Sequence, residues 1–432
     1  MKVNYYNHFI KQPNSVIFFN ALTDSYIILK ENIFTDFDAN KNNLQIFQQN
    51  FPKQYDVLCK NGFIVEDDFD EKEYYMNLHY ERKFARNVYE LIINPTLNCN
   101  LGCWYCYESH KKKSELNAEA INSILLHIKQ KHDLDKFSNL RFGFFGGEPL
   151  LKPKIVMKLI NRVNELAEEK KFKLTLSFTT NGTILPSELL SLLKNFNANF
   201  QITLDGAKEI HDTTRFFNTQ KREGSYELIL KNVKKIMETL TDFKITLRIN
   251  YTSKTLNSLK QIIDDFNFCD RKKTTISLHK VWQADPGIID KSLLFDFINY
   301  AKDNNFIVNY MNINPQFYVC YADNYNEAVI NYNGDVFKCT ARDFATEPPE
   351  GKLLKDGSIR WDTDRWLKRI NLRLSSICLD CNLLPACGGH CSQARLEQGE
   401  NVECVLDKDF TKDDYIIHNL NRQLLTNKIN TL

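Results

Sequence analysis

Three closely spaced cysteines constrain this chain more than any other feature of its sequence. Cys99, Cys103 and Cys106 lie in the run C-N-L-G-C-W-Y-C, which has the spacing C-x-x-x-C-x-x-C. Three thiolates on one tight loop can hold three irons of a four-iron cubane. Most cysteine-ligated clusters carry four cysteines and are coordinatively closed. The missing fourth cysteine therefore indicates an iron that is open to a substrate, and chemistry beyond plain electron transfer.

Zinc and chance are the two alternatives for this trio. A zinc site usually joins C-x-x-C to a distant second pair, and no such pair lies beside the trio. Chance remains an alternative in a chain with 12 cysteines. With Tyr105 before the third cysteine, the run resembles the signature of the radical S-adenosylmethionine (SAM) enzymes. The resemblance implies that the open iron chelates SAM, and that an electron from the cluster cleaves SAM to a 5′-deoxyadenosyl radical.

Length, charge and cysteine usage limit the class of protein. A chain of 432 residues with 43% hydrophobic residues suggests two or three domains with sizeable cores. With 56 basic and 54 acidic residues, it offers no electrostatic case for a nucleic-acid or membrane partner. Residues 1–10 lack the apolar core of a signal peptide, and no apolar run reaches membrane-helix length. We therefore expect metal-ligating cysteines in a reducing, cytoplasmic compartment.

From about residue 86, six apolar segments alternate with helical patterns. The predicted strands cover residues 88–94, 140–145, 174–179, 200–204, 244–251 and 274–279. Such alternation predicts a parallel α/β array, which right-handed crossovers curl toward a barrel. Six units are too few for a full eight-unit barrel, so we expect a partial (β/α)6 barrel. The polar and glycine-rich motifs follow the strands, at the edge where such folds bind ligands.

The second strand is followed by Gly146, Gly147, Glu148 and a proline. Two glycines let the backbone approach a ligand, and a carboxylate there can receive an ammonium group. An ordinary strand-to-helix turn is the alternative. The resemblance to radical SAM enzymes assigns this stretch to the methionine amino group, with Glu148 as the charged partner.

Four further residues are carried over as SAM contacts. Thr180 and Asn181 end the third strand, and the resemblance places them on the ribose side of the pocket. It places Thr203 and Arg215 near the SAM carboxylate, which a guanidinium can grip through two hydrogen bonds. The alternatives are a β-branched strand residue for Thr203 and a surface arginine for Arg215.

Seven more cysteines follow in the C-terminal part of the chain. In order they are Cys320, Cys339, Cys378, Cys381, Cys387, Cys391 and Cys404. This order resembles the SPASM extension of radical SAM enzymes that modify peptides and proteins. The resemblance implies a first auxiliary cluster on Cys320, Cys339 and Cys391, and a second on Cys378, Cys381, Cys387 and Cys404. Zinc on the C-x-x-C segment is the alternative. Because residues 312–318 lack a further cysteine, the first auxiliary cluster would have an open iron or a non-cysteine ligand.

The N-terminal segment carries no cysteine motif. Its apolar pattern predicts strands at 16–20 and 26–29, a helical stretch at 44–58 broken by Pro52, and a strand at 62–65. Such a winged-helix-like module could recognise the leader of a peptide, or it could be a packing extension. We therefore expect three segments: residues 1–85 as this module, 86–310 as the partial barrel and 311–432 as the auxiliary-cluster domain.

The leading hypothesis is a radical SAM maturase of ribosomally made precursor peptides. It would form a thioether, carbon–carbon or carbon–oxygen link, with an external electron donor such as flavodoxin or ferredoxin as a second partner. One alternative is an anaerobic sulfatase-maturing enzyme that forms formylglycine, although Thr340 stands where such enzymes carry an aspartate. A non-catalytic iron–sulfur or zinc protein is the other alternative, and it leaves the motifs at the strand ends unexplained.

Overall fold

The chain folds into two compact units that interleave along the sequence. The computed structural model describes residues 1–310, 319–404, 406 and 410–431. The N-terminal unit comprises residues 1–84 and 371–423 with a short piece ending at Asn324, and the barrel unit comprises 85–310, 325–370 and the chain end from Leu424. This grouping crosses the three consecutive segments expected from the sequence, because residues 371–423 pack with the N-terminal residues. The three segments therefore remain a proposal about function.

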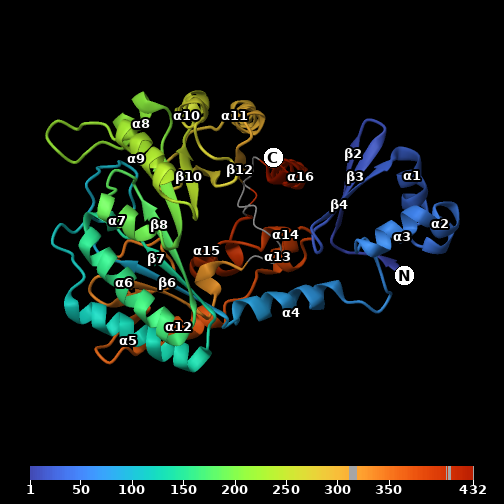
Figure 1. Ribbon diagram of the computed structural model, residues 1–432. Coiled ribbons are helices and arrows are strands. Elements are labelled where there is room, and N and C mark those ends of the chain that lie inside the picture. Colours follow the sequence, from blue (N-terminus) through green and yellow to red (C-terminus); the bar gives the residue numbers. More distant parts are fainter. Residues whose placement is uncertain (311–318, 405, 407–409, 432) are drawn as a thin grey trace. The chain divides into compact units, whose positions relative to one another are not determined.

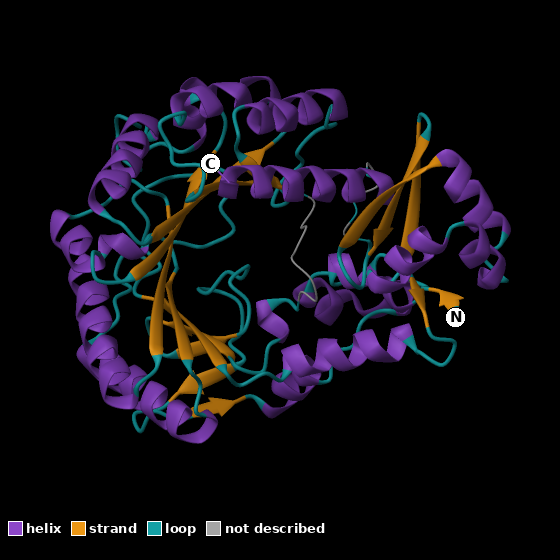
Figure 2. Ribbon diagram, turned by 45° about the vertical axis from the view of Figure 1, so that its right-hand side comes forward, coloured by secondary structure: helices purple, strands orange, loops and turns teal. Residues whose placement is uncertain are grey.

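The barrel unit is built on seven parallel strands that pair in chain order. They are β6 (Val88–Asn94), β7 (Asn139–Phe144), β8 (Lys173–Thr180), β9 (Asn197–Leu204), β10 (Phe243–Tyr251), β11 (Thr274–Lys280) and β12 (Ile307–Asn309). The first six are the strands that the sequence predicts. The sheet curves with helices on its outer side (Figures 1 and 2), which confirms the expected partial barrel.

Five strands of this sheet were not predicted from the sequence. Besides β12, they are β13 (Glu327–Asn331), β14 (Asp335–Phe337), β15 (Gly351–Leu353) and β16 (Ile359–Trp361). The strand β13 pairs in parallel with β6, and β14 to β16 continue in antiparallel order. Four of the five have only three residues, and β13 is buried at every position. A strand of three residues is too short to show the alternating pattern of a half-buried strand, and a fully buried strand does not alternate.

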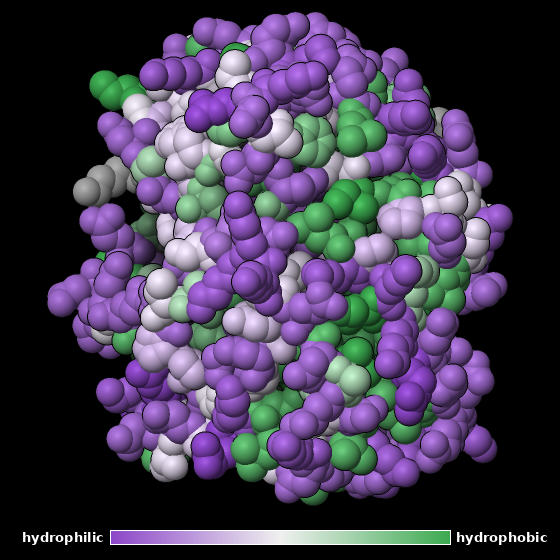
Figure 3. Space-filling view, turned by 90° about the vertical axis from the view of Figure 1, so that its left-hand side faces the viewer, coloured by the Kyte–Doolittle hydropathy of each residue, from purple (hydrophilic) through white to green (hydrophobic). Residues whose placement is uncertain are grey.

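Helices cover the outer side of the barrel. They are α5 (Ala118–Asp135), α6 (Pro153–Lys170), α7 (Ser187–Leu193), α8 (Lys208–Thr214), α9 (Tyr226–Thr239), α10 (Leu259–Asp265), α11 (Lys291–Asp303) and α12 (Thr363–Ile370), with short 3-10 turns η1 (Pro149–Leu151) and η2 (Leu256–Ser258). The side chain of Asn117 caps α5 by accepting from the Ala120 N–H, and Pro153 occupies the first turn of α6. The face in Figure 3 is mainly hydrophilic with smaller hydrophobic areas.

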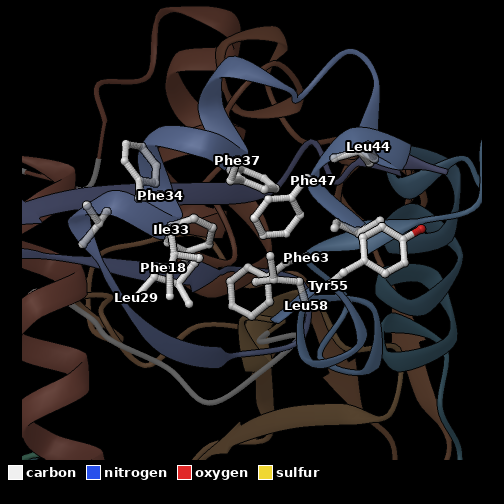
Figure 4. Packing of buried hydrophobic residues seen from close by; sticks show 12 residues of the cluster. Phe18, Leu29, Ile33, Phe34, Phe37, Leu44, Phe47, Tyr55, Leu58 and Phe63 are labelled. Carbon is white, nitrogen blue, oxygen red and sulfur yellow. The ribbon is translucent and has the colours of Figure 1, made fainter. Parts of the chain in front are cut away.

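The N-terminal unit contains a small antiparallel sheet with helices packed against it. Its elements begin with β1 (Lys2–Val3), β2 (Asn7–Gln12), β3 (Ser15–Asn20), β4 (Ser25–Lys30), α1 (Glu31–Ala39), α2 (Leu44–Asn50), α3 (Pro52–Lys60) and β5 (Ile64–Val65). The sheet order is β2-β3-β4, and β5 pairs with β1. Phe18, Phe37, Phe47 and Phe63 meet in the core of this part (Figure 4). The predicted order of hairpin, helices and closing strand is confirmed.

The same unit continues with one long helix and the C-terminal cysteine segment. These elements are α4 (Glu71–Lys83), the 3-10 turns η3 (Tyr321–Asp323) and η4 (Gly399–Asn401), α13 (Ser376–Leu379), α14 (Leu384–Cys387), α15 (Ser392–Gln398) and the start of α16 (Lys412–Thr431). The side chain of Asp70 caps α4 by accepting from the Glu73 N–H at 2.9 Å. None of the helices in the described part of the chain combines the length and apolar character that a bilayer crossing needs.

Candidate functional site

The three N-terminal cysteines line one pocket of the barrel unit. They lie on the loop that follows β6, and the pocket encloses about 800 Å³, including space open to solvent. Most of the other predicted SAM contacts line it too: Gly146, Gly147, Thr180, Asn181, Thr203 and Arg215. Because parallel strands end at the same edge of a sheet, motifs separated by more than 100 residues meet here. Glu148 is the predicted contact that does not line the pocket.

The cysteines sit where hydrogen bonds reach their sulfurs. The Leu101 N–H donates to Cys99 Sγ at 3.5 Å, and Asn181 Nδ2 donates to the same sulfur at 3.7 Å. His110 Nε2 lies 3.6 Å from Cys106 Sγ. Burial raises the pKa of the Cys99 thiol to about 12 and that of Cys106 to about 11. Thiols held in one pocket beside such donors suit an iron–sulfur cluster, whose sulfurs accept hydrogen bonds from the protein.

The two glycines pack directly against the chain that leads to the cysteines. A Cβ atom on Gly146 would lie 2.4 Å from the Thr96 carbonyl oxygen, and one on Gly147 would lie 2.4 Å from that of Asn98. Gly146 also has φ +106°, in a region that disfavours other residues. Both positions therefore need glycine for the packing of two loops, and the same backbone forms part of the pocket wall.

Glu148 is fully buried and connects the ends of two strands. Its carboxylate accepts from the Leu150 N–H at 2.9 Å, the Thr180 hydroxyl at 2.9 Å and the Asn181 N–H at 2.7 Å. Burial raises the pKa of Glu148 to about 7 against the opposing effect of these donors. The observed role of the carboxylate is to hold the loop after β8 in place. Its contact with an ammonium group of SAM stays a prediction.

A buried polar network holds Arg215 in the pocket. Tyr105 donates its hydroxyl proton to the two carboxylate oxygens of Asp205, at 2.7 and 2.8 Å. Arg215 Nη1 donates to the Tyr105 oxygen at 2.9 Å and lies 3.3 Å from Asp205 Oδ2. Asn250 Nδ2 donates to the Tyr105 oxygen at 3.0 Å. Asp205 follows β9 in a pair that sequence alone presents as a tight turn, and its position after a strand was the only available signal.

Removing the charge of Asp205 should destabilise the barrel unit. Arg215 is only 8% exposed and pairs with Asp205, so Asp205→Asn would break a buried ion pair. Loss of one partner from a buried ion pair costs several kcal/mol, and we expect the free energy of unfolding to fall by about 3 kcal/mol. Denaturant unfolding measures this change. Asp296→Asn, which breaks an exposed pair with Lys260, is the matched control and should change stability little.

The pocket also contains polar residues that the sequence analysis did not single out. They include Glu108, Gln201, Arg248, Asn250 and Gln283. Arg248 Nε donates to Asn250 Oδ1 at 3.2 Å. Burial raises the pKa of Glu108 to about 8, and Asp343 adds to the effect. Arg248 and Asn250 lie on the same strand, β10, whereas Glu108, Gln201 and Gln283 come from other parts of the chain. None of the five belongs to a recognisable motif, so only the fold brings them together.

Four C-terminal cysteines form a second group, in the N-terminal unit. Burial raises the pKa of Cys378 and of Cys387, and Cys381 and Cys404 lie close enough to both to raise it further. The Gly389 N–H donates to Cys387 Sγ at 3.3 Å, and His390 Nδ1 lies 3.3 Å from Cys378 Sγ. In the described residues, no three His, Cys, Asp or Glu side chains converge on a position for a single metal ion.

The other predicted auxiliary ligands are distributed over both units. Cys320 and Cys391 belong to the N-terminal unit, and Cys339 belongs to the barrel unit. The Ala341 N–H donates to Cys339 Sγ at 3.4 Å. Residues 312–318, where an additional ligand was considered, lie outside the described residues. Their grouping into a first auxiliary cluster stays a prediction.

Comparison with known sequences identifies the class of this site. Residues 93–266 match the model of the Radical SAM superfamily. The radical SAM cyclopropyl synthase TigE of Paramaledivibacter caminithermalis is 23% identical over 382 residues, which cover 79% of this chain and 77% of TigE. The cysteine-type anaerobic sulfatase-maturating enzyme of Clostridium novyi is 28% identical over 187 residues, 41% of this chain. The matched region spans about half the length of that enzyme (49%).

Solved structures share the fold. The structure of anSMEcpe with bound AdoMet has a TM-score of 0.56 at 20% identity, covering 80% of this chain and 99% of the other. Streptococcus suis SuiB bound to precursor peptide SuiA has a TM-score of 0.52 at 17% identity, covering 93% and 98%. The chain carries a radical SAM domain. The chain is similar in sequence to a radical SAM cyclopropyl synthase and to a cysteine-type anaerobic sulfatase-maturating enzyme.

Proposed function

We propose that this enzyme is a radical SAM maturase that oxidatively modifies a ribosomally made precursor peptide. The observation that carries the proposal is the meeting of three cysteine thiols, the Gly146–Gly147 backbone and the Arg215 network in one pocket. The cysteine order after residue 320 and the extent of the similarity to TigE add support, since that similarity reaches beyond the radical SAM domain. The new bond would be a thioether, a carbon–carbon or a carbon–oxygen link.

Different residues of the pocket would bind the cluster and SAM. Cys99, Cys103 and Cys106 would ligate a four-iron cluster, which with SAM supplies a 5′-deoxyadenosyl radical that abstracts hydrogen from the substrate. The Gly146–Gly147 backbone would face the amino group of SAM, and Thr180 and Asn181 its ribose. Arg215, held by Tyr105 and Asp205, would orient the carboxylate together with Thr203.

The second cysteine array would remove the electron that product formation releases. Cys378, Cys381, Cys387 and Cys404 are proposed to ligate one auxiliary cluster, and Cys320, Cys339 and Cys391 are proposed to ligate the other. The hydrogen bonds that already reach Cys378 and Cys387 suit sulfurs that carry negative charge. An external donor such as flavodoxin or ferredoxin would reduce the first cluster.

The direct test is to incubate the enzyme with small peptides encoded beside its gene and to weigh the products. A maturase that forms a new bond between two residues should remove two hydrogens from one peptide, in a reaction that depends on SAM. Conversion of a cysteine or serine to formylglycine would instead identify the sulfatase-maturing alternative. Thr340, which replaces the aspartate of those enzymes, favours the peptide maturase.

The outer edge of β4, with which no other strand of the described residues pairs, is the proposed binding site for the leader of the precursor. The other edge strand, β2, contacts Asn382 at its start: the Asn382 carbonyl accepts from His8 Nε2 at 3.1 Å, and the Asn382 side chain donates to the Asn7 carbonyl at 3.5 Å. The start of β4 is contacted by α16, because the Tyr26 hydroxyl donates to the Ile416 carbonyl at 3.3 Å. On β4, Ile28 is 64% exposed. An extended peptide could add to such an edge through backbone hydrogen bonds and cover the exposed side chain.

Ile28→Glu should weaken binding of the full precursor at least tenfold. The added charge would be desolvated by the leader strand, while 5′-deoxyadenosine formation without peptide should not change. Ile46→Glu is the same substitution at a 41% exposed isoleucine on α2. This control variant should bind the full precursor with unchanged affinity. Fluorescence anisotropy of a labelled precursor measures both. Equal affinities of the two variants would argue against leader binding at β4.

A further inference from the structure

The helix α4 buries a polar face. Its four buried residues are Glu71, Tyr75, His79 and Lys83, and a spacing of four places them on one side of the helix. Helices usually bury an apolar stripe, because a buried polar group without a partner destabilises the fold. The buried side of α4 therefore requires polar partners.

The two ends of this polar face have such partners. Glu71 accepts from the Tyr5 N–H at 3.1 Å and pairs with Lys2 Nζ at 3.0 Å. Lys83 Nζ donates to the Leu372 carbonyl at 3.0 Å. In the middle, the Tyr75 hydroxyl and His79 Nδ1 are buried without a hydrogen-bond partner in the described part of the chain. Tyr75 has no exposed surface, so solvent does not replace the missing partner.

The unpaired Tyr75 hydroxyl lies beside the second cysteine group. α4 runs alongside α13 and α14 within the N-terminal unit (Figure 1), and Lys72 Nζ binds the Asp380 carboxylate at 3.0 Å. Burial raises the pKa of the Tyr75 phenol, and Cys387 and Cys378 lie close enough to raise it further. His390 Nε2, next to Cys378, is likewise buried without a partner. Two buried polar groups without a hydrogen-bond partner in the described residues thus lie near the proposed cluster ligands.

We propose that the Tyr75 hydroxyl donates a hydrogen bond to a sulfur of the auxiliary cluster held by Cys378, Cys381, Cys387 and Cys404. The inference rests on the proposed presence of that cluster. A hydrogen bond to sulfur stabilises the more negative, reduced state and so raises the reduction potential. Tyr75 is then a tuning residue, and a helix from the N-terminal segment completes the surroundings of a C-terminal cluster.

The chain offers a matched control. Tyr415 is also fully buried; burial raises its pKa, and Cys387 lies close enough to raise it further. Its hydroxyl, however, donates to the Ala386 carbonyl at 2.7 Å. Tyr415→Phe therefore removes a hydroxyl at a similar place without removing a donor to the cluster. Tyr75→Phe removes a hydroxyl that has no protein partner, so the packing of α4 should be retained.

The experiment is an EPR-monitored redox titration of the full chain, in a background with Cys99, Cys103 and Cys106 replaced by alanine. Tyr75→Phe should move one auxiliary potential to more negative values, leave the other in place and keep the iron content. It should also remove one exchangeable proton coupling from the ENDOR spectrum. Incorporation of 3-fluorotyrosine at position 75, a stronger donor, should move the potential the other way. Tyr415→Phe should leave both potentials unchanged.

The possible failures are distinguishable. Unchanged potentials and proton couplings in Tyr75→Phe, with full iron content, would overturn the hydrogen bond and leave the cluster assignment standing. Equal shifts in Tyr75→Phe and Tyr415→Phe would also overturn it, because they would reflect general packing. A background variant without iron would overturn the auxiliary cluster, and the inference with it.

Discussion

Replacing Cys99, Cys103 and Cys106 together with alanine should abolish 5′-deoxyadenosine production. The three thiols line the pocket with the proposed SAM contacts, and no open iron can form there without them. The auxiliary cysteines are untouched, so iron should fall from about twelve to about eight atoms per chain, four for each lost cubane. Chromatography of the nucleoside and an iron assay measure the two effects.

Cys269→Ala is the control for this experiment. Cys269 is 4% exposed and lies outside both cysteine arrays. Its loss should leave the iron content and the nucleoside yield unchanged. Undiminished SAM cleavage in the triple variant would refute the assignment of the first cluster, whatever the behaviour of the C-terminal cysteines.

Cys381→Ala should abolish modified peptide while leaving SAM cleavage in place. Radical generation needs only the barrel pocket, whereas product formation needs a path for the released electron. Iron should fall by about four atoms per chain, and nucleoside should accumulate without a matching amount of product. Mass spectrometry of the peptide beside quantified 5′-deoxyadenosine gives the ratio.

Two results would contradict the proposed auxiliary clusters, and the first is bound zinc. Bound zinc with about four irons per chain would place zinc on the C-x-x-C segment and remove the proposed electron path. Normal product from Cys381→Ala, with unchanged iron, would likewise show that this cysteine has no role in the reaction. Cys59→Ala, in a cysteine outside both arrays, controls for loss of a thiol alone.

Local patterns predicted much of the fold and the pocket. The C-x-x-x-C-x-x-C run, the Gly-Gly-Glu stretch and the Thr-Asn pair each lie within a few residues, and each follows a strand with a clear apolar pattern. A repeated strand–helix order then places them at one edge without further information. The network of Tyr105, Asp205 and Asn250 was missed, because its members lie up to 145 residues apart and each alone is unremarkable.

Glu148 and α4 show what the sequence could not predict: the contacts of a side chain and a helix without an amphipathic pattern. The contact of Glu148 with SAM stays a prediction, and the motif did not suggest that its carboxylate also accepts from Thr180 and Asn181. A motif thus identifies a residue without giving the direction of its side chain. The segment before α4 is acidic, and the buried face of this helix is polar, so an amphipathic pattern that would predict the helix is absent.

The N-terminal unit is built from segments that lie far apart in the sequence, and this affects how it folds during synthesis. The Tyr5 hydroxyl donates to the Asp380 carbonyl at 2.8 Å, across 375 residues of chain. Residues 1–84 emerge from the ribosome long before their packing partners in 371–423. Contacts of such sequence separation form slowly, and domains generally fold as they are made. The early segment therefore waits until residues 371–423 have been made, and the second cysteine group becomes complete only after Cys404 has been added.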